Sequence, residues 1–273
     1  MKISIVTACY NSKATIQRTL ESVAAQQGRV AIEHVIQDGG STDGTTSLIE
    51  DYMDPVRRVD TCSGLSVCDG SELEVLWNSE PDAGFYDAIN KGIDRATGEV
   101  IGLINADDWL ADDHVLADVA ALFESDDGLD IVYADLDYVE LNPAPFSSSP
   151  RQGGGILKDS RATPLPFSHK VKRHWVAGDF SLSAMKNGWM PPHPTLYVRR
   201  RVFEQFGSYR LDLGSAADYE WIVRIFAKAK LKCAYLPRVT VKMLMGGQSN
   251  ESVGARLKAN RSDRRAWAGN GMK

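Results

Sequence analysis

The first 110 residues alternate between short apolar runs and longer stretches in which apolar side chains recur every three or four positions. Four apolar runs predict β-strands, at residues 3–6, 32–36, 73–77 and 100–104. The stretches between them predict three helices. Ser12 could cap the first, in which apolar residues between 16 and 24 share one face, the second includes residues 48–52, and the third extends from about residue 85 to 96. Strands that alternate with helices indicate an α/β protein, with a doubly wound, mostly parallel, Rossmann-like sheet and helices on both faces.

The second half of the chain is less regular. Residues 195–198 and 233–236 predict strands, and residues 217–229 predict a helix. Two polar stretches look inserted. Residues 55–70 form the first, and residues 142–173, rich in Pro, Ser and Gly, predict a long loop or a mobile lid.

Composition narrows the class of protein. The chain has 273 residues, is 43% hydrophobic and carries a formal net charge of −5, which argues against a nucleic-acid partner. No apolar run approaches the roughly 20 residues that span a bilayer, and the N-terminal run reads as a first strand rather than a signal peptide. The four cysteines have no CxxC spacing, so we expect neither zinc nor a disulfide framework, and a cytoplasmic location.

Polar segments follow the predicted strands, where a doubly wound sheet binds its ligands. Residues 7–11 could hydrogen-bond or stack on a nucleobase, or form a plain turn. In DGGSTDGT at 38–45, Asp38 can accept hydrogen bonds from a ribose or a base edge. This segment approaches a phosphate-binding P-loop, but Thr45 stands where that loop needs Lys. Asp43 is better explained as a helix N-cap.

Two further sites carry carboxylates. Asp107 and Asp108 follow a buried strand, where their mutual repulsion favours binding of a hard cation such as Mg²⁺ or Mn²⁺. The alternative is an exposed acidic turn in which Asp108 caps a helix. Asp218 lies near the start of the helix predicted at 217–229, where helix capping is the simpler explanation.

Together these segments resemble the family 2 glycosyltransferases, which have a GT-A fold, and within them bacterial enzymes that build cell-surface polysaccharides. The resemblance runs from Lys2 to about Ser249 and implies one domain over residues 1–249. Its nucleotide-binding half would extend to about residue 110, its acceptor half from 111, and a basic tail would follow at 250–273. The stretches that carry it are TACYN (7–11), DGGSTDGT (38–45), SEPDAGFYDAINKGI (79–93), GEVIGLINADDWL (98–110), HPTLYVRR (193–200), ADYEW (217–221) and GGQS (246–249).

The resemblance also implies residue roles. A nucleotide site would include Thr7, Tyr10, Asp38, Asp82 and Asn105. The family's metal-binding DXD motif stands at 105–107, so Asp107, with Asp108, would hold the ion. Asp218 would be the general base, and Trp189 and His193 would line the sugar or acceptor pocket.

Three departures from the family pattern matter. Gly39 follows Asp38 where many members have a second Asp, and the first DXD position is the neutral Asn105. All five histidines precede Asp218, so the metal-binding His that some members carry after the base is absent or replaced.

The implied activity is metal-dependent, inverting transfer of a sugar from a nucleotide-diphosphate donor, a UDP-sugar, to a hydroxyl of a glycan or lipid-linked acceptor. The basic tail suggests peripheral contact with the inner face of the cell membrane. Two alternatives remain. A sugar nucleotidyltransferase would need a basic Gly-rich loop near the N-terminus, of which TACYNSK is a poor version. A non-catalytic sugar-binding protein would not need the retained Asp107, Asp108 and Asp218.

Overall fold

The computed structural model describes residues 1–53, 72–142, 168–246 and 270. The predicted inserted stretch at 55–70, most of the predicted loop at 142–173 and the basic tail except Asn270 lie outside these residues. The first half comprises the elements β1 (Lys2–Cys9), α1 (Ile16–Ala24), β2 (Ala31–Asp38), α2 (Thr45–Met53), β3 (Glu72–Ser79), α4 (Phe85–Arg95) and β4 (Val100–Leu103). The second half comprises β5 (Trp109–Leu110), α5 (Val115–Ser125), β6 (Ile131–Leu141), β7 (His169–Trp175), α6 (Leu182–Lys186), η1 (His193–Thr195), β8 (Tyr197–Arg199), α7 (Arg200–Phe206), η2 (Leu211–Ala216), α8 (Ala217–Ile222), the π-helical η3 (Val223–Lys228) and β9 (Cys233–Leu244).

The described strands form one sheet in the order β3-β2-β1-β4-β8-β6-β9-β5, and β7 pairs with β6 outside this path. The strands β3, β2, β1 and β4 are mutually parallel, β6 and β9 are parallel to each other, and β8 runs antiparallel between the two groups. The predicted mostly parallel, doubly wound sheet is confirmed.

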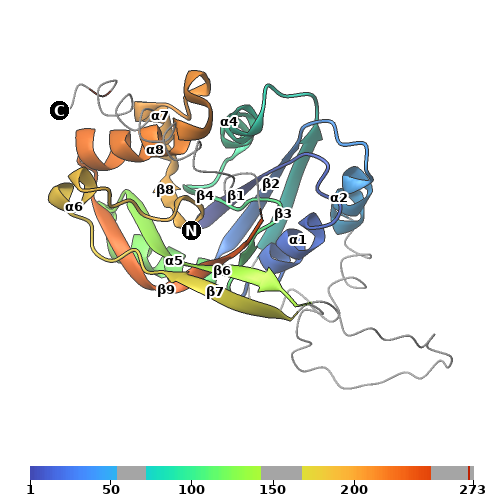
Figure 1. Cartoon of the computed structure of the whole chain (residues 1–273), viewed down its shortest axis with the longest axis horizontal. Coiled ribbons are helices and arrows are strands. Elements are labelled where there is room, and N and C mark those ends of the chain that lie inside the picture. Colours follow the sequence, from blue (N-terminus) through green and yellow to red (C-terminus); the bar gives the residue numbers. More distant parts are fainter. Residues whose placement is uncertain (54–71, 143–167, 247–269, 271–273) are drawn as a thin grey trace.

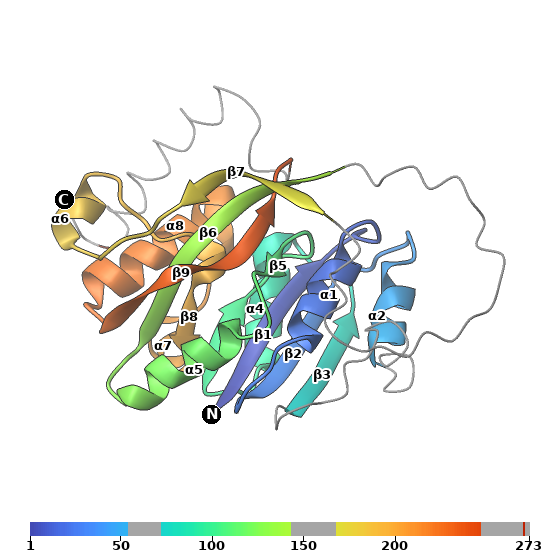
Figure 2. The same ribbon diagram turned by 90° about the horizontal axis from the view of Figure 1, so that it is seen from below.

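Helices cover both faces of this sheet, as predicted. The helices α4, α7 and α8 lie on one face, where their apolar side chains join a core that includes Ile89, Phe203 and Trp221 (Figures 1 and 2). On the other face, α5 packs over β6 and β9 and α1 packs against β5 and α2. The helix α4 approaches β1 closely because it has a glycine there. A Cβ atom on Gly92 would lie 2.4 Å from Cγ1 of Val6.

The four predicted strands of the first half and the helix over 85–96 are confirmed. The loop prediction is wrong for residues 169–173, which belong to β7. The strand β7 pairs with β6 along one edge and buries little of its surface, so its side chains can be polar. Its sequence therefore lacks the apolar alternation that would have predicted a strand. The helix predicted over 217–229 changes from α- to π-helical at Val223. Within residues 1–53, 72–142 and 168–246, no helix is long and apolar enough to cross a membrane.

Candidate active site

The loop after β2 is organised around Asp38, whose side chain is fully buried. Its carboxylate accepts hydrogen bonds from the backbone N–H groups of Gly40 (3.1 Å) and Ser41 (2.9 Å) and from the Ser79 hydroxyl (2.6 Å). Burial raises the pKa of Asp38, but these hydrogen bonds outweigh it and lower the pKa overall. Asp38 is therefore ionised and shapes the loop. Its contact with a nucleotide stays a prediction.

Two of the predicted nucleotide-binding residues meet at Gly39. A Cβ atom there would lie 2.5 Å from an Asp82 carboxylate oxygen and 3.3 Å from the Tyr10 ring. Tyr10 is 63% exposed, and Asp82 is half-buried and accepts a hydrogen bond from Gly84 N–H at 2.8 Å. The glycine thus lets an exposed aromatic ring and a carboxylate come together at the carboxyl ends of β1–β3, a setting that suits a nucleobase.

Thr7 points elsewhere. It is fully buried, and its hydroxyl lies 3.0 Å from Nε2 of His34, whose Nδ1 lies 3.0 Å from the Tyr52 hydroxyl. Burial lowers the pKa of His34 to about 3, so the imidazole is neutral in this chain. The Thr7 side chain supports the sheet beneath the loop, and its predicted contact with the nucleotide remains open.

The turn after β4 holds two unlike carboxylates. Asp108 is fully buried, and its oxygens accept hydrogen bonds from Asn105 Nδ2 (2.8 Å) and Leu244 N–H (3.1 Å). Burial and the charge of Asp107 raise its pKa well above the usual range. Asp107 is half-buried. Burial raises its pKa, which the Arg18 guanidinium opposes. Asp108 thus ties the turn to β9, and Asp107 is the more exposed carboxylate of the pair. The metal contacts predicted for both stay predictions.

Asp218 lies at the start of α8, surrounded by groups from three other segments. Tyr86 of α4 lies beside it, and burial and the Asp218 charge raise the pKa of Tyr86. His193 Nε2 lies 2.8 Å from the Tyr209 hydroxyl. Burial lowers the pKa of His193, which the Asp218 charge opposes. The structure thus brings the predicted base close to the predicted pocket residue His193. Tyr86 and Tyr209 were not identified from the sequence.

Trp189 belongs to an aromatic cluster on the same side of the sheet. Its indole N–H donates to the Ala177 carbonyl at 2.7 Å, and its ring lies 5.4–6.0 Å from the rings of Tyr133, Phe180 and Phe226. Its indole donor is already satisfied, so any contact with a sugar would use the ring.

Known proteins share this fold. The chain superimposes on Staphylococcus aureus TarS 1–349 in complex with UDP with a TM-score of 0.58 and 18% identity, covering all of this chain and 67% of that one. A mannosyltransferase from Pyrobaculum calidifontis, in complex with GDP-Man and Mn²⁺, gives a TM-score of 0.59 at 14% identity, covering 98% of this chain and 63% of that one. The chain spans 39% of a longer TarS chain. The predicted GT-A fold is confirmed.

Sequence comparison decides the family, since the model of "Glycosyl transferase family 2" matches residues 4–179. The chain belongs to glycosyltransferase family 2. It is 29% identical to an uncharacterized glycosyltransferase of Mycobacterium tuberculosis, Rv1514c, over 226 residues, 81% of this chain and 68% of that protein. It is 28% identical to a PGL/p-HBAD biosynthesis glycosyltransferase of Mycobacterium bovis over 251 residues, 92% of this chain and 80% of that protein.

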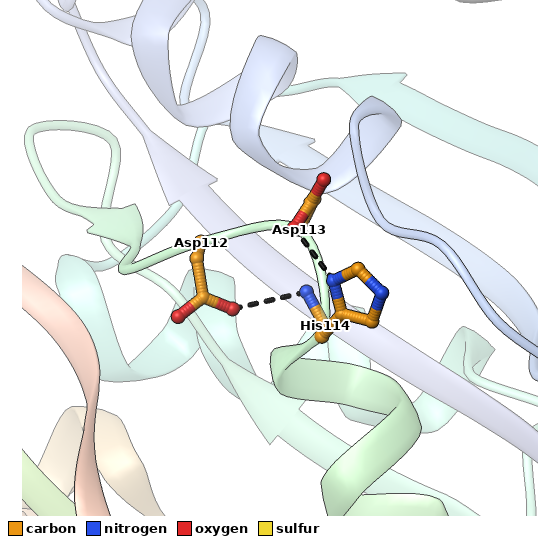
Figure 3. A group of neighbouring side chains, drawn as sticks. All are labelled: Asp112, Asp113 and His114. Atoms are coloured by element: carbon orange, nitrogen blue, oxygen red, sulfur yellow. Dashed lines mark hydrogen bonds and ion pairs between the residues drawn. The ribbon is translucent and has the colours of Figure 1, made fainter. Parts of the chain in front are cut away.

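This family 2 enzyme has one further cluster of potential metal ligands among its described residues, Asp112, Asp113 and His114 (Figure 3). An Asp112 oxygen accepts from His114 N–H at 3.0 Å, and the other oxygen pairs with Arg238. One Asp113 oxygen lies 2.6 Å from His114 Nδ1, and the other accepts from Gln27 at 2.7 Å. Because protein groups engage these carboxylates, the cluster is explained as the structured turn that precedes α5.

Proposed function

We propose that the chain is a metal-dependent, inverting glycosyltransferase that moves a sugar from a UDP-sugar to an acceptor hydroxyl in cell-surface polysaccharide biosynthesis. The observation that carries the proposal is the environment of Asp218, which lies close to Tyr86, to the half-buried His193 and to the buried Tyr209. The separate cradle of Tyr10, Gly39 and Asp82 suits the nucleoside.

Asp107 fits a Mn²⁺ or Mg²⁺ ion, because a half-buried carboxylate with a raised pKa gains from a hard cation that takes oxygen ligands. Asp108 supports the turn that presents Asp107, and Asn105 holds Asp108. When bound there, the ion would supply positive charge next to the diphosphate, whose negative charge grows as it leaves.

The proposed chemistry assigns the proton to Asp218. Its carboxylate takes the proton from the acceptor hydroxyl while that oxygen forms a bond to the anomeric carbon. The bond from this carbon to the diphosphate oxygen breaks on the opposite side, and the diphosphate leaves with the electron pair. A single displacement without a covalent intermediate inverts the anomeric centre, so a UDP-α-sugar gives a β-linked product.

Trp189 and His193 would line the sugar or acceptor pocket. In this proposal His193 stays neutral, because burial lowers its pKa, and its Nε2 holds Tyr209 beside Tyr86. The acceptor would be a glycan or a lipid-linked glycan. We place the reaction in the cytoplasm, with the basic tail at 250–273 as a contact with the inner face of the membrane.

A donor screen tests the proposal directly. UDP release is measured across nucleotide-sugars with and without Mn²⁺, and the anomeric configuration of the product is determined by NMR. Asp218→Asn should lower turnover by about 10²–10⁴-fold and leave UDP affinity nearly unchanged. Asp212→Asn is the matched control, because Asp212 is an exposed acid in the preceding η2 whose side chain pairs with Arg210.

Release of pyrophosphate instead of UDP would indicate a nucleotidyltransferase, and binding without turnover would indicate a non-catalytic protein. If Asp218→Asn retains more than about a tenth of wild-type turnover, Asp218 is not the base.

A further inference from the structure

A cavity of about 310 Å³ lies between α1 and the strands β5, β7 and β9. It is separate from the cradle at Gly39 and from the surroundings of Asp218, because none of the residues that form those two sites lines it. The charged and aromatic residues that line it are Arg18, Trp109, Asp112, Asp113, His169 and Lys242.

Three basic side chains converge on this cavity. Burial lowers the pKa of His169, and the positive charges of Lys242 and Arg18 lower it further, against the opposing charge of Asp137. The Arg18 guanidinium lies 4.7 Å from the centre of the Trp109 ring, and the His169 ring meets the same indole edge-on at 5.6 Å. Trp109, only 3% exposed, therefore holds two of the three basic groups in place.

The two acids at the cavity wall have partners of their own, and the charges of Asp107 and Glu21 act on Arg18 from outside the wall. Asp113 contacts the imidazole of His114 (Figure 3). Asp112 also pairs with Arg238, and Asp113 accepts a hydrogen bond from the amide of Gln27. Each carboxylate thus has its own partner. Guanidinium, ammonium and imidazole donors that face one cavity form the usual binding set for phosphate or carboxylate oxygens.

The position of the cavity distinguishes it from the donor site. Its wall includes Ser22 and Ala25, which lie about 9 and 13 Å along α1 from its first residue, Ile16, at 1.5 Å per residue. Because α1 follows β1, its start lies near the carboxyl ends of the strands, and the cavity extends away from that edge. The end of the cavity that is lined by Arg18 lies towards Asp107, whose charge acts on Arg18, whereas Ser22 and Ala25 line the end that is further from the donor site.

We propose that this cavity binds a phosphate or carboxylate group of a ligand other than the donor nucleotide. The lining of the cavity alone supports an oxyanion site. We assign the ligand to an anionic acceptor substrate, and this assignment rests on the proposed function. Arg18 and Lys242 supply permanent charge, and His169 adds a donor that becomes charged when the anion is bound, since a bound anion raises its pKa.

The test is an NMR titration of the imidazole C2 protons against pH, with inorganic phosphate and, separately, acetate as the probe. Phosphate or acetate should raise the pKa of His169, whereas the C2 resonance of His174, which is exposed on the same strand, should respond to neither anion. A response to phosphate identifies a phosphate site, and a response to acetate alone identifies a carboxylate site. Lys242→Gln should weaken the anion affinity about tenfold or more. Lys170→Gln, which removes a neighbouring exposed lysine that does not line the cavity, should leave it unchanged.

Three results would overturn the proposal: a His169 resonance that responds to neither anion, equal anion affinity in Lys242→Gln and the wild type, or loss of the anion response when UDP and Mg²⁺ are saturating. UDP binding is recorded in the same samples through its own resonances. Failure of UDP to bind would count against the proposed function and leave the anion measurement intact.

Discussion

Replacing Glu33 with Gln should remove a large, pH-dependent share of the stability of the sheet. Glu33 lies in β2 and is fully buried. Its carboxylate accepts hydrogen bonds from the Ser4 hydroxyl (2.5 Å) and from Thr97 N–H (2.7 Å), and pairs with Lys2 Nζ at 2.7 Å. Burial alone would raise the pKa of Glu33, but these contacts outweigh it and lower the pKa to about 2.

The sign and size of the effect follow from this shift. The folded state holds the ionised form more tightly than the unfolded chain, where Glu has a pKa of about 4.3. The stabilisation is therefore complete above about pH 4.3 and is lost as the pH falls towards 2. A difference of roughly two pKa units corresponds to about 3 kcal/mol at 1.36 kcal/mol per unit.

Urea unfolding of the wild type and Glu33→Gln measures this directly. The variant should be about 3 kcal/mol less stable at pH 7, and the gap should narrow as the pH falls below about 4. Glu74→Gln is the control, because Glu74 is the exposed second partner of Lys2, and its loss should cost less than about 1 kcal/mol. A gap below about 1 kcal/mol at pH 7, or one that stays constant down to pH ~3, would refute the reasoning.

The other predictions concern the site and the tail. Asp107→Ala should abolish the metal-dependent part of UDP affinity in calorimetric titrations with Mn²⁺, and unchanged affinity would move the ion to Asp108 or remove it. Tyr86→Phe should lower kcat about tenfold with the donor KM unchanged, because it removes the hydroxyl that lies beside Asp218, and an equal rise in KM would contradict this. Truncation after Gly254 should reduce sedimentation with anionic vesicles at low salt, since each basic residue near the surface contributes ~1 kcal/mol, yet spare transfer to a soluble acceptor mimic. Equal vesicle binding by both proteins would disprove the membrane contact.

The sequence was sufficient to place the polar motifs at the carboxyl ends of the strands, because each motif directly follows its strand in the chain. The positions of Asp38, Asp82 and Asp107 at one edge follow from the α/β alternation alone. What each carboxylate does there depends on distant partners. The sequence does not show that Asp108 accepts a hydrogen bond from the N–H of Leu244, far along the chain on β9.

Other features could not be predicted from the sequence, because they depend on contacts between segments that are far apart in the chain. Tyr86 and Tyr209 approach Asp218 from separate segments, and no periodicity in the sequence marks either one. The strand β7 was missed because its exposed Lys and Arg side chains resemble those of a loop. The direction of the Thr7 side chain could not be predicted, because β1 is buried on both faces and its sequence therefore has no polar side.

The junction between β4 and β8 is a short seam that joins two sections of the sheet. It consists of three residue pairs, Val100–Arg199, Ile101–Val198 and Gly102–Tyr197. A Cβ atom on Gly102 would lie 2.7 Å from the Tyr197 ring, so this glycine sets how closely the two strands fit. A larger side chain at Gly102 would shift one section against the other and slow turnover without altering a residue of either ligand site.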